Sequence, residues 1–266
     1  MKPALTALGA LSVVALLAGC SAAEDDSSST PSGPGSPAPA AITGEVTVFA
    51  AASLKSTFTE LGARFENDHP GTKVTLNFAG SSDLVAQLAQ GAPADVLASA
   101  DTTTMTRALD DGLVAGVPAD FATNTLTIVT PPGNPAGIAS FADLADSAVQ
   151  VVVCAPQVPC GAATEKVENA TGVTLTPVSE ESGVTDVLGK ITSGQADAGL
   201  VYVTDAASAG DRVTAIPFPE SSDAVNTYPI ATLTEATNPS AAQTFVGLVT
   251  GPQGREVLSA AGFGTP

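Results

Sequence analysis

The chain is poor in the residues that bind zinc and nucleic acids. Among its 266 residues it has one histidine, three cysteines and nine lysines and arginines in total, against 27 aspartates and glutamates. Zinc sites are built from several His or Cys ligands, so a single histidine argues against a zinc site. The formal net charge of −18 leaves no basic surface for a polyanion. We therefore expect neither a zinc protein nor a nucleic-acid-binding protein.

The sequence also lacks the common motifs of nucleophilic hydrolases. It contains no Gly-x-Ser-x-Gly and no Ser-x-x-Lys, and its one histidine, His69, lies in the turn-forming sequence of residues 67–71. Residues 183–190 resemble a phosphate-binding loop, but five residues instead of four separate the glycines, and isoleucine follows the lysine. These absences favour a binding function. A secreted hydrolase and a surface interaction protein with an unused cleft are the alternatives.

The N-terminus has the pattern of a bacterial lipoprotein signal. Lys2 precedes an apolar run over 5–17, and Leu17-Ala18-Gly19-Cys20 forms a lipobox. The run is shorter than the roughly 20 apolar residues that a membrane-spanning helix needs. We expect a signal peptide at 1–19 and a lipid on Cys20. Residues 20–41, rich in Ser, Pro and Gly, would then be a disordered tether, and the protein would be extracytoplasmic, anchored by lipid to the outer face of the cytoplasmic membrane.

Two further cysteines, Cys154 and Cys160, lie six positions apart in the sequence. In an oxidising compartment outside the cytoplasm, such a pair is more often bonded than free. We therefore predict a disulfide between them.

Short β-rich runs alternate with helix-length segments from residue 45 onward. The predicted strands are 46–50, 74–78, 96–99, 126–129, 149–153, 199–203 and 228–233. The predicted helices are 54–66, 84–90, 102–110, 162–169, 185–192 and two more, after Pro239 and after Pro252. This alternation predicts an α/β fold with parallel βαβ units. In such folds, ligands bind where the carboxyl ends of strands lead into helix N-termini.

Four such junctions consist of small, uncharged residues at the turn. They are 49–53, 78–82, 158–161 and 182–184. Helix N-termini offer unpaired N–H groups and a positive dipole end, so several of them together form an anion site without Lys or Arg. Taken singly, Ser53, Ser81 and Ser182 are more typical of ordinary helix N-caps than of ligand donors.

A fully deprotonated tetrahedral dianion only accepts hydrogen bonds, and neutral donors suit it. Phosphate keeps a proton in part of its population and would use an acceptor. The nearby acids leave that alternative open, although each is also well placed in or before a first helical turn facing solvent. They are Asp83, Glu180, Glu181 and Asp186.

In this order, the junctions resemble the periplasmic molybdate-binding component of ABC transporters, over nearly all of 45–263. The matching motifs are Val48-Phe49-Ala50-Ala51-Ala52-Ser53-Leu54, Gly91-Ala92-Pro93-Ala94-Asp95-Val96, Ser99-Ala100-Asp101, Gly199-Leu200-Val201-Tyr202, Asp205-Ala206, Phe218-Pro219-Glu220, Tyr228-Pro229 and Gly251-Pro252. The resemblance implies a type II periplasmic-binding fold with two α/β lobes, a hinge crossed twice by the chain, and the ligand in the cleft. Lobe 1 would comprise 42–123 and 228–266, and lobe 2 would comprise 124–227.

The resemblance also implies a ligand set. It assigns the hydroxyls of Ser53, Ser81 and Tyr202 and the backbone N–H groups of Cys160 and Val184 to the oxyanion. The ligand would be molybdate or tungstate, so the metal enters as an oxyanion, with sulfate or another tetrahedral oxyanion as the alternative. Neither catalysis nor a cofactor is implied. The expected partners are permease subunits, and we expect a monomer.

Three positions depart from the family pattern. Cys160 stands where alanine is common, Gly80 replaces a serine that some relatives have, and Asp186 adds charge near the site. Because the main chain binds at position 160, the cysteine itself is compatible with the predicted role.

Overall fold

The computed structural model describes residues 42–266, which lie within one compact unit. The predicted signal peptide, the predicted lipidation site at Cys20 and the predicted tether lie outside the described residues. Within 42–266, no helix combines the length and the apolar character needed to cross a membrane.

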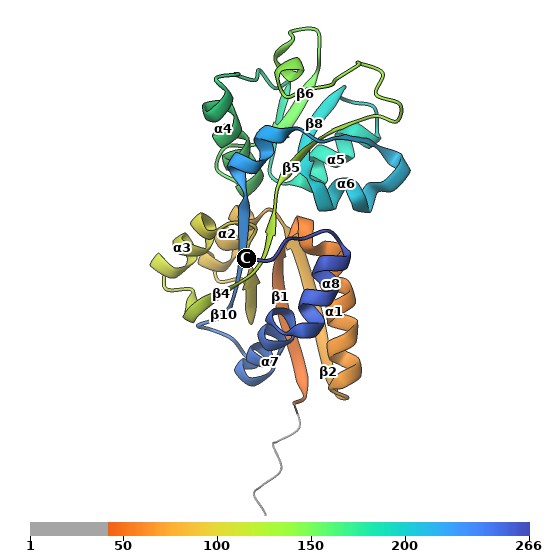
Figure 1. The fold of residues 1–266 in the computed structure, drawn as a ribbon. Coiled ribbons are helices and arrows are strands. Elements are labelled where there is room, and N and C mark those ends of the chain that lie inside the picture. The colour runs from red at the N-terminus through yellow and green to blue at the C-terminus, as the bar shows by residue number, and fades with distance from the viewer. Residues whose placement is uncertain (1–41) are drawn as a thin grey trace, which may run out of the picture. The chain divides into compact units, whose positions relative to one another are not determined.

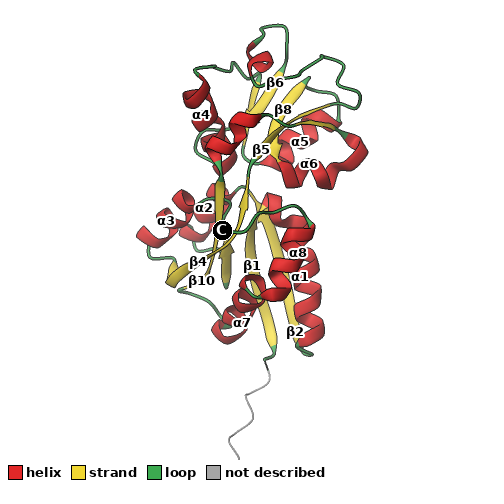
Figure 2. Ribbon diagram, in the orientation of Figure 1, coloured by secondary structure: helices red, strands yellow, loops and turns green. Residues whose placement is uncertain are grey.

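The described chain forms two five-stranded mixed sheets (Figures 1 and 2). The first has the order β2-β1-β3-β10-β4 and the second β7-β6-β8-β5-β9. The strands of the first sheet are β1 (Gly44–Ala51), β2 (Thr72–Ala79), β3 (Val96–Ala98), β4 (Val114–Asn124) and β10 (Asn226–Leu233). Those of the second are β5 (Leu126–Thr130), β6 (Val151–Cys154), β7 (Ser179–Glu181), β8 (Ala198–Tyr202) and β9 (Thr214–Ile216).

Helices cover both faces of each sheet. Figure 1 shows α1, α7 and α8 grouped on one side of the first sheet and α2 and α3 on the other, and α4 opposite α5 and α6 at the second sheet. The α-helices are α1 (Lys55–Asp68), α2 (Ser81–Ala89), α3 (Thr102–Asp110), α4 (Pro159–Thr171), α5 (Val184–Thr192), α6 (Val203–Ala209), α7 (Pro239–Thr250) and α8 (Pro252–Ala260). Short 3-10 helices are η1 (Ala52–Leu54), η2 (Ala142–Ala145), η3 (Gly210–Arg212) and η4 (Pro219–Ala224).

The predicted α/β character is confirmed, and all seven predicted strands form. The prediction of parallel strands holds for β1, β2 and β3 and for β6, β7 and β8, whereas β5 and β10 run antiparallel to their neighbours. The reason is that the chain passes from the first sheet to the second at β4–β5 and returns at η4–β10. A strand that enters a sheet from the other sheet arrives in the opposite direction.

Three strands and one helix were not expected from the sequence. The strands β4, β7 and β9 all lie at sheet edges. Two of them have only three residues, and β4 contains Pro118, which is tolerated at an edge because no ladder partner needs its missing N–H. The helix α6 follows β8 directly, with no turn-forming residues between them, so the sequence pattern does not show where the strand ends and the helix begins.

The core of the first sheet holds the start of α1 in place. Phe58, Leu61 and Phe65 recur at helical spacing, are almost fully buried, and form one face of α1. Phe58 and Phe65 pack against Phe245 of α7 with ring centroids 6.0 and 5.5 Å apart. This packing anchors the turn η1, which carries Ser53, at the end of β1.

Candidate anion-binding site

One cavity is lined by all five predicted site residues. They are Ser53, Ser81, Cys160, Val184 and Tyr202. The remaining lining residues are also uncharged, and include Gly80, Ser182 and Gly183. None of the four acids near the junctions, Asp83, Glu180, Glu181 and Asp186, lines it. The cavity therefore presents hydrogen-bonding groups without a carboxylate.

Strand ends and helix starts from both sheets bring these residues together. Ser53 lies in η1 directly after β1, and Ser81 is the first residue of α2 after β2. On the other side, Cys160 is the second residue of α4, Val184 is the first residue of α5, and Tyr202 is the last residue of β8. These are the carboxyl ends of the parallel strands, where open α/β sheets bind ligands.

The two backbone donors have no hydrogen-bond partner in the part of the chain that the structure describes. Within residues 42–266, the N–H groups of Cys160 and Val184 have no protein acceptor. Both belong to the first turn of a helix, whose N–H groups have no carbonyl in a preceding turn to bond. Each also lies at the positive end of a helix dipole, which favours a bound anion.

The serine hydroxyls are not helix caps. The N-cap positions of η1, α2 and α5 are Ala51, Gly80 and Gly183, and none makes a side-chain cap hydrogen bond. Instead, Ser81 Oγ accepts the Ala100 N–H at 3.0 Å, which leaves the Ser81 proton free to donate. The capping role that the sequence left open for Ser53, Ser81 and Ser182 is therefore wrong.

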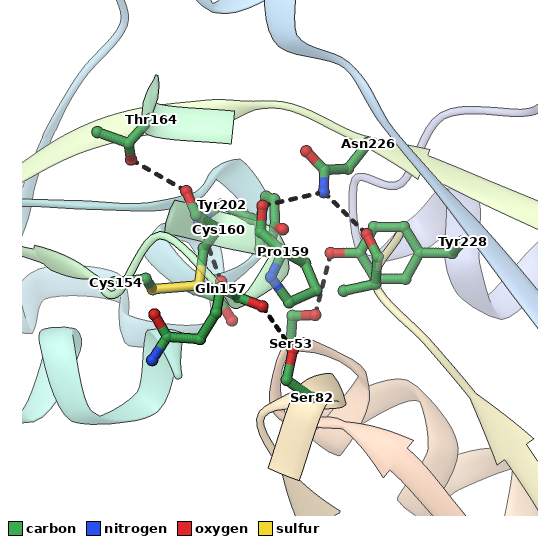
Figure 3. Close-up of a disulfide and its surroundings, with 12 residues drawn as sticks. Ser53, Ser82, Cys154, Gln157, Pro159, Cys160, Thr164, Tyr202, Asn226 and Tyr228 are labelled. Atoms are coloured by element: carbon green, nitrogen blue, oxygen red, sulfur yellow. Dashed lines mark hydrogen bonds between the residues drawn. A yellow bond between two sulfur atoms is a disulfide. The ribbon is translucent and has the colours of Figure 1, made fainter. Parts of the chain in front are cut away.

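Ser53 is held by a tyrosine that the sequence analysis did not assign to the site. Ser53 Oγ lies 3.0 Å from Tyr228 Oη (Figure 3). When Tyr228 donates in this pair, the Ser53 proton is free for a ligand. Burial raises the pKa of Tyr228 far above its usual range, so the phenol keeps its proton.

Tyr202 carries a buried hydroxyl with no partner. The residue is 1% exposed, and within residues 42–266 its Oη makes no hydrogen bond. Burial, and then the neighbouring Tyr228, raise the pKa of Tyr202, so Oη stays protonated and is a donor. A buried hydroxyl without a partner costs about 1–3 kcal/mol. An acceptor in the cavity would remove this penalty.

Two polar residues that do not line the cavity form hydrogen bonds to residues that do. The buried Asn226, at the start of β10, donates from Nδ2 to Ala100 O at 2.9 Å and to Pro159 O at 3.4 Å, and so links loops that belong to different sheets (Figure 3). Asp205 Oδ2 accepts the Tyr202 N–H at 3.1 Å, and burial raises the pKa of Asp205 to about 7. Asn226 is visible in the sequence only as a polar residue before a strand, which is too weak a signal to assign it.

Cys154 and Cys160 form a disulfide, with their Cα atoms 5.6 Å apart (Figure 3). The bond joins the last residue of β6 to the second residue of α4. It closes a short loop whose Ala155 N–H also bonds Glu181 O at 2.8 Å. The disulfide and this hydrogen bond to β7 therefore both fix the position of the loop that leads to the Cys160 N–H.

Known proteins share this sequence and fold. Residues 46–264 match the family described as bacterial extracellular solute-binding protein. The molybdate-binding protein ModA of Mycobacterium tuberculosis (strain ATCC 25618 / H37Rv) is 50% identical over 261 residues, which cover 98% of this chain and 97% of that relative.

Two solved structures share the fold. The periplasmic molybdate-binding protein of Azotobacter vinelandii matches with a TM-score of 0.69 and 21% identity, over 83% of this chain and 99% of that one. The sulfate-binding protein SubI of M. tuberculosis matches with a TM-score of 0.66 and 21% identity, over 82% and 86%.

Proposed function

Because the chain belongs to the bacterial extracellular solute-binding protein family, we propose that it captures molybdate or tungstate outside the cytoplasm for an ABC importer. Members of this family bind solutes and are not enzymes, as the sequence predicted. The predicted type II periplasmic-binding fold is confirmed by the likeness to the A. vinelandii protein.

The observation that carries the proposal is the Tyr202 hydroxyl, which has no partner within residues 42–266 and lies in a cavity that the same residues line only with uncharged groups. A tetrahedral dianion accepts hydrogen bonds and donates none, so a shell of neutral donors suits it. In our proposal, Tyr202, Ser53 and Ser81 donate their hydroxyl protons to the anion, and Cys160 and Val184 donate their N–H groups. No cofactor takes part.

In this proposal, each of the two sheets, with its helices, forms one lobe of the protein, and the anion binds between the lobes. We propose the lobe limits expected from the sequence, 42–123 with 228–266 and 124–227, with closure around the anion signalling occupancy to the permease subunits. We further propose that the protein is a monomer, with a lipid on Cys20 holding it at the outer face of the membrane.

Sulfate is the second candidate, because a sulfate-binding protein shares the fold at a similar TM-score. A thermal-shift panel on residues 42–266 with molybdate, tungstate, sulfate and phosphate separates the candidates. At a molybdate concentration of about 100 times Kd, the stabilisation is about 2.7 kcal/mol. For a domain of this size the melting temperature then rises by about 5–10 °C. A clear shift with sulfate and none with millimolar molybdate would favour the second candidate.

A further inference from the structure

The side chain of Asn226 lies where the two sheets meet, next to the proposed anion site. Asn226 is the first residue of β10 and is 4% exposed. Its Nδ2 donates to Ala100 O at 2.9 Å and to Pro159 O at 3.4 Å (Figure 3). Ala100 follows β3 of the first sheet, Pro159 opens α4 at the second sheet, and both residues line the cavity. One amide group therefore joins the two sides of the cavity.

We propose that Asn226 is a positioning residue for anion binding, which fixes one hydrogen-bond donor on each side of the cavity. The inference rests on the proposed function, since it concerns the donors assigned there to the anion. Asn226 itself does not line the cavity. It acts through the two backbone carbonyls that it binds.

On the side of the second sheet, Asn226 sets the direction of the Cys160 N–H. Pro159 O and this N–H belong to one peptide group, and no peptide bond within residues 42–266 is cis. In a planar trans peptide the C=O and N–H bonds point in opposite directions, so a carbonyl held toward Asn226 turns the N–H away from it. The hydrogen bond to the carbonyl also polarises the peptide group, which makes its N–H a stronger donor.

On the side of the first sheet, Asn226 acts on Ser81 through Ala100. The Ala100 N–H donates to Ser81 Oγ at 3.0 Å, and the Ala100 carbonyl accepts from Asn226. Ala100 is thus held through both of its backbone polar groups. Because its N–H occupies a lone pair of Ser81 Oγ, the hydroxyl proton of Ser81 is left for a ligand. Without the bond from Asn226, Ala100 could shift and the orientation of the Ser81 hydroxyl would no longer be fixed.

The position requires a donor and not only a side chain that fills the space. Both partners are carbonyl oxygens, which accept hydrogen bonds and never donate them, so only the N–H groups of the amide can face them. Asn226 Oδ1 is buried and has no partner within residues 42–266. A buried acceptor without a partner is unfavourable, so the contribution of this side chain lies in its two N–H groups. Leucine, of similar size, would keep the packing and lose both bonds.

Asn226→Ala tests the proposal, with Asn238→Ala as the matched control. Asn238 Nδ2 also donates to two backbone carbonyls, Thr43 O at 2.9 Å and Glu45 O at 3.2 Å, but none of these three residues lines the cavity. Titration calorimetry with molybdate on residues 42–266 should show at least about tenfold weaker binding for Asn226→Ala and for Asn226→Leu, the loss expected when one donor no longer reaches the anion. Asn238→Ala should bind within about threefold of wild type, although both alanine variants should melt at a lower temperature.

A double-mutant cycle separates positioning from a general loss of stability. If Asn226 acts through Ser81, its replacement matters less once the Ser81 hydroxyl is gone. Asn226→Ala combined with Ser81→Ala should therefore weaken binding by less than the product of the two single effects, whereas Asn238→Ala combined with Ser81→Ala should give the product.

The outcomes distinguish the role of Asn226 from the proposed function. Wild-type affinity in both Asn226→Ala and Asn226→Leu would overturn the positioning role, and so would independent effects of Asn226→Ala and Ser81→Ala in the cycle. Absence of molybdate binding in wild type would instead overturn the proposed function.

Discussion

Tyr202→Phe should weaken anion binding while leaving the ligand-free protein at least as stable as wild type. The change removes one oxygen and keeps the ring, which packs edge-on against Tyr228 with centroids 5.8 Å apart. Because Oη has no partner within residues 42–266, its removal breaks no protein hydrogen bond. It also removes a buried hydroxyl without a partner among the described residues, which costs about 1–3 kcal/mol of stability.

The two effects have opposite signs, which makes the variant informative. A hydrogen bond to a charged ligand contributes about 1.5–3 kcal/mol, which corresponds to about 10- to 150-fold in Kd. Titration calorimetry with molybdate measures the loss of affinity, and urea unfolding without ligand measures stability.

Tyr228→Phe is the control, since its hydroxyl bonds Ser53 Oγ at 3.0 Å and Tyr228 does not line the cavity. That variant should lose about 1 kcal/mol of stability and less affinity than Tyr202→Phe. If Tyr202→Phe bound molybdate as tightly as wild type, the Tyr202 hydroxyl would not be a donor to the ligand, and our reasoning about the site would be refuted.

Two other changes probe the charge of the site and of its support. Ser81→Asp puts a carboxylate at the cavity in the first turn of α2, where the helix dipole stabilises a negative charge. Thermal melting should show that the variant stays folded, and calorimetry should show that it no longer binds molybdate. Retained affinity would contradict the donor role of Ser81. Burial raises the pKa of Asp205 to about 7, so the folded state favours the protonated carboxyl. The free energy of unfolding of wild type, relative to that of Asp205→Asn, should therefore fall by up to about 4 kcal/mol as the pH rises from about 4 to about 7. Urea unfolding at several pH values measures this difference, and parallel stability curves for the two proteins would exclude it.

The sequence by itself determined the alternation of strands and helices and the position of the cavity-forming junctions. The buried strand β6 is a run of apolar residues, and helices such as α7 and α8 begin at a proline, so local patterns suffice to predict these elements. The small residues at Ser53 and Ser81 mark sharp strand-to-helix turns, and their meeting at one edge follows from the parallel arrangement of the strands.

The formation of the short edge strands and the direction of the antiparallel strands depended on the tertiary structure. β7 and β9 have three residues each, so their pairing comes from the neighbouring strand and not from a pattern of their own. The antiparallel direction of β5 and β10 follows from the crossings between sheets, which no short window of sequence contains.

Only the tertiary structure decided which polar groups are occupied and which are free. The Ser53–Tyr228 bond and the Asn226 bridge join residues far apart in the chain, so no spacing rule predicts them. That the Tyr202 hydroxyl has no partner among the described residues is likewise a property of its surroundings, because any nearby carbonyl would have accepted its hydrogen bond. Gly80 looks like an ordinary turn residue in sequence, and only the tertiary structure shows that the backbone of Ser182, from the other sheet, lies close to it.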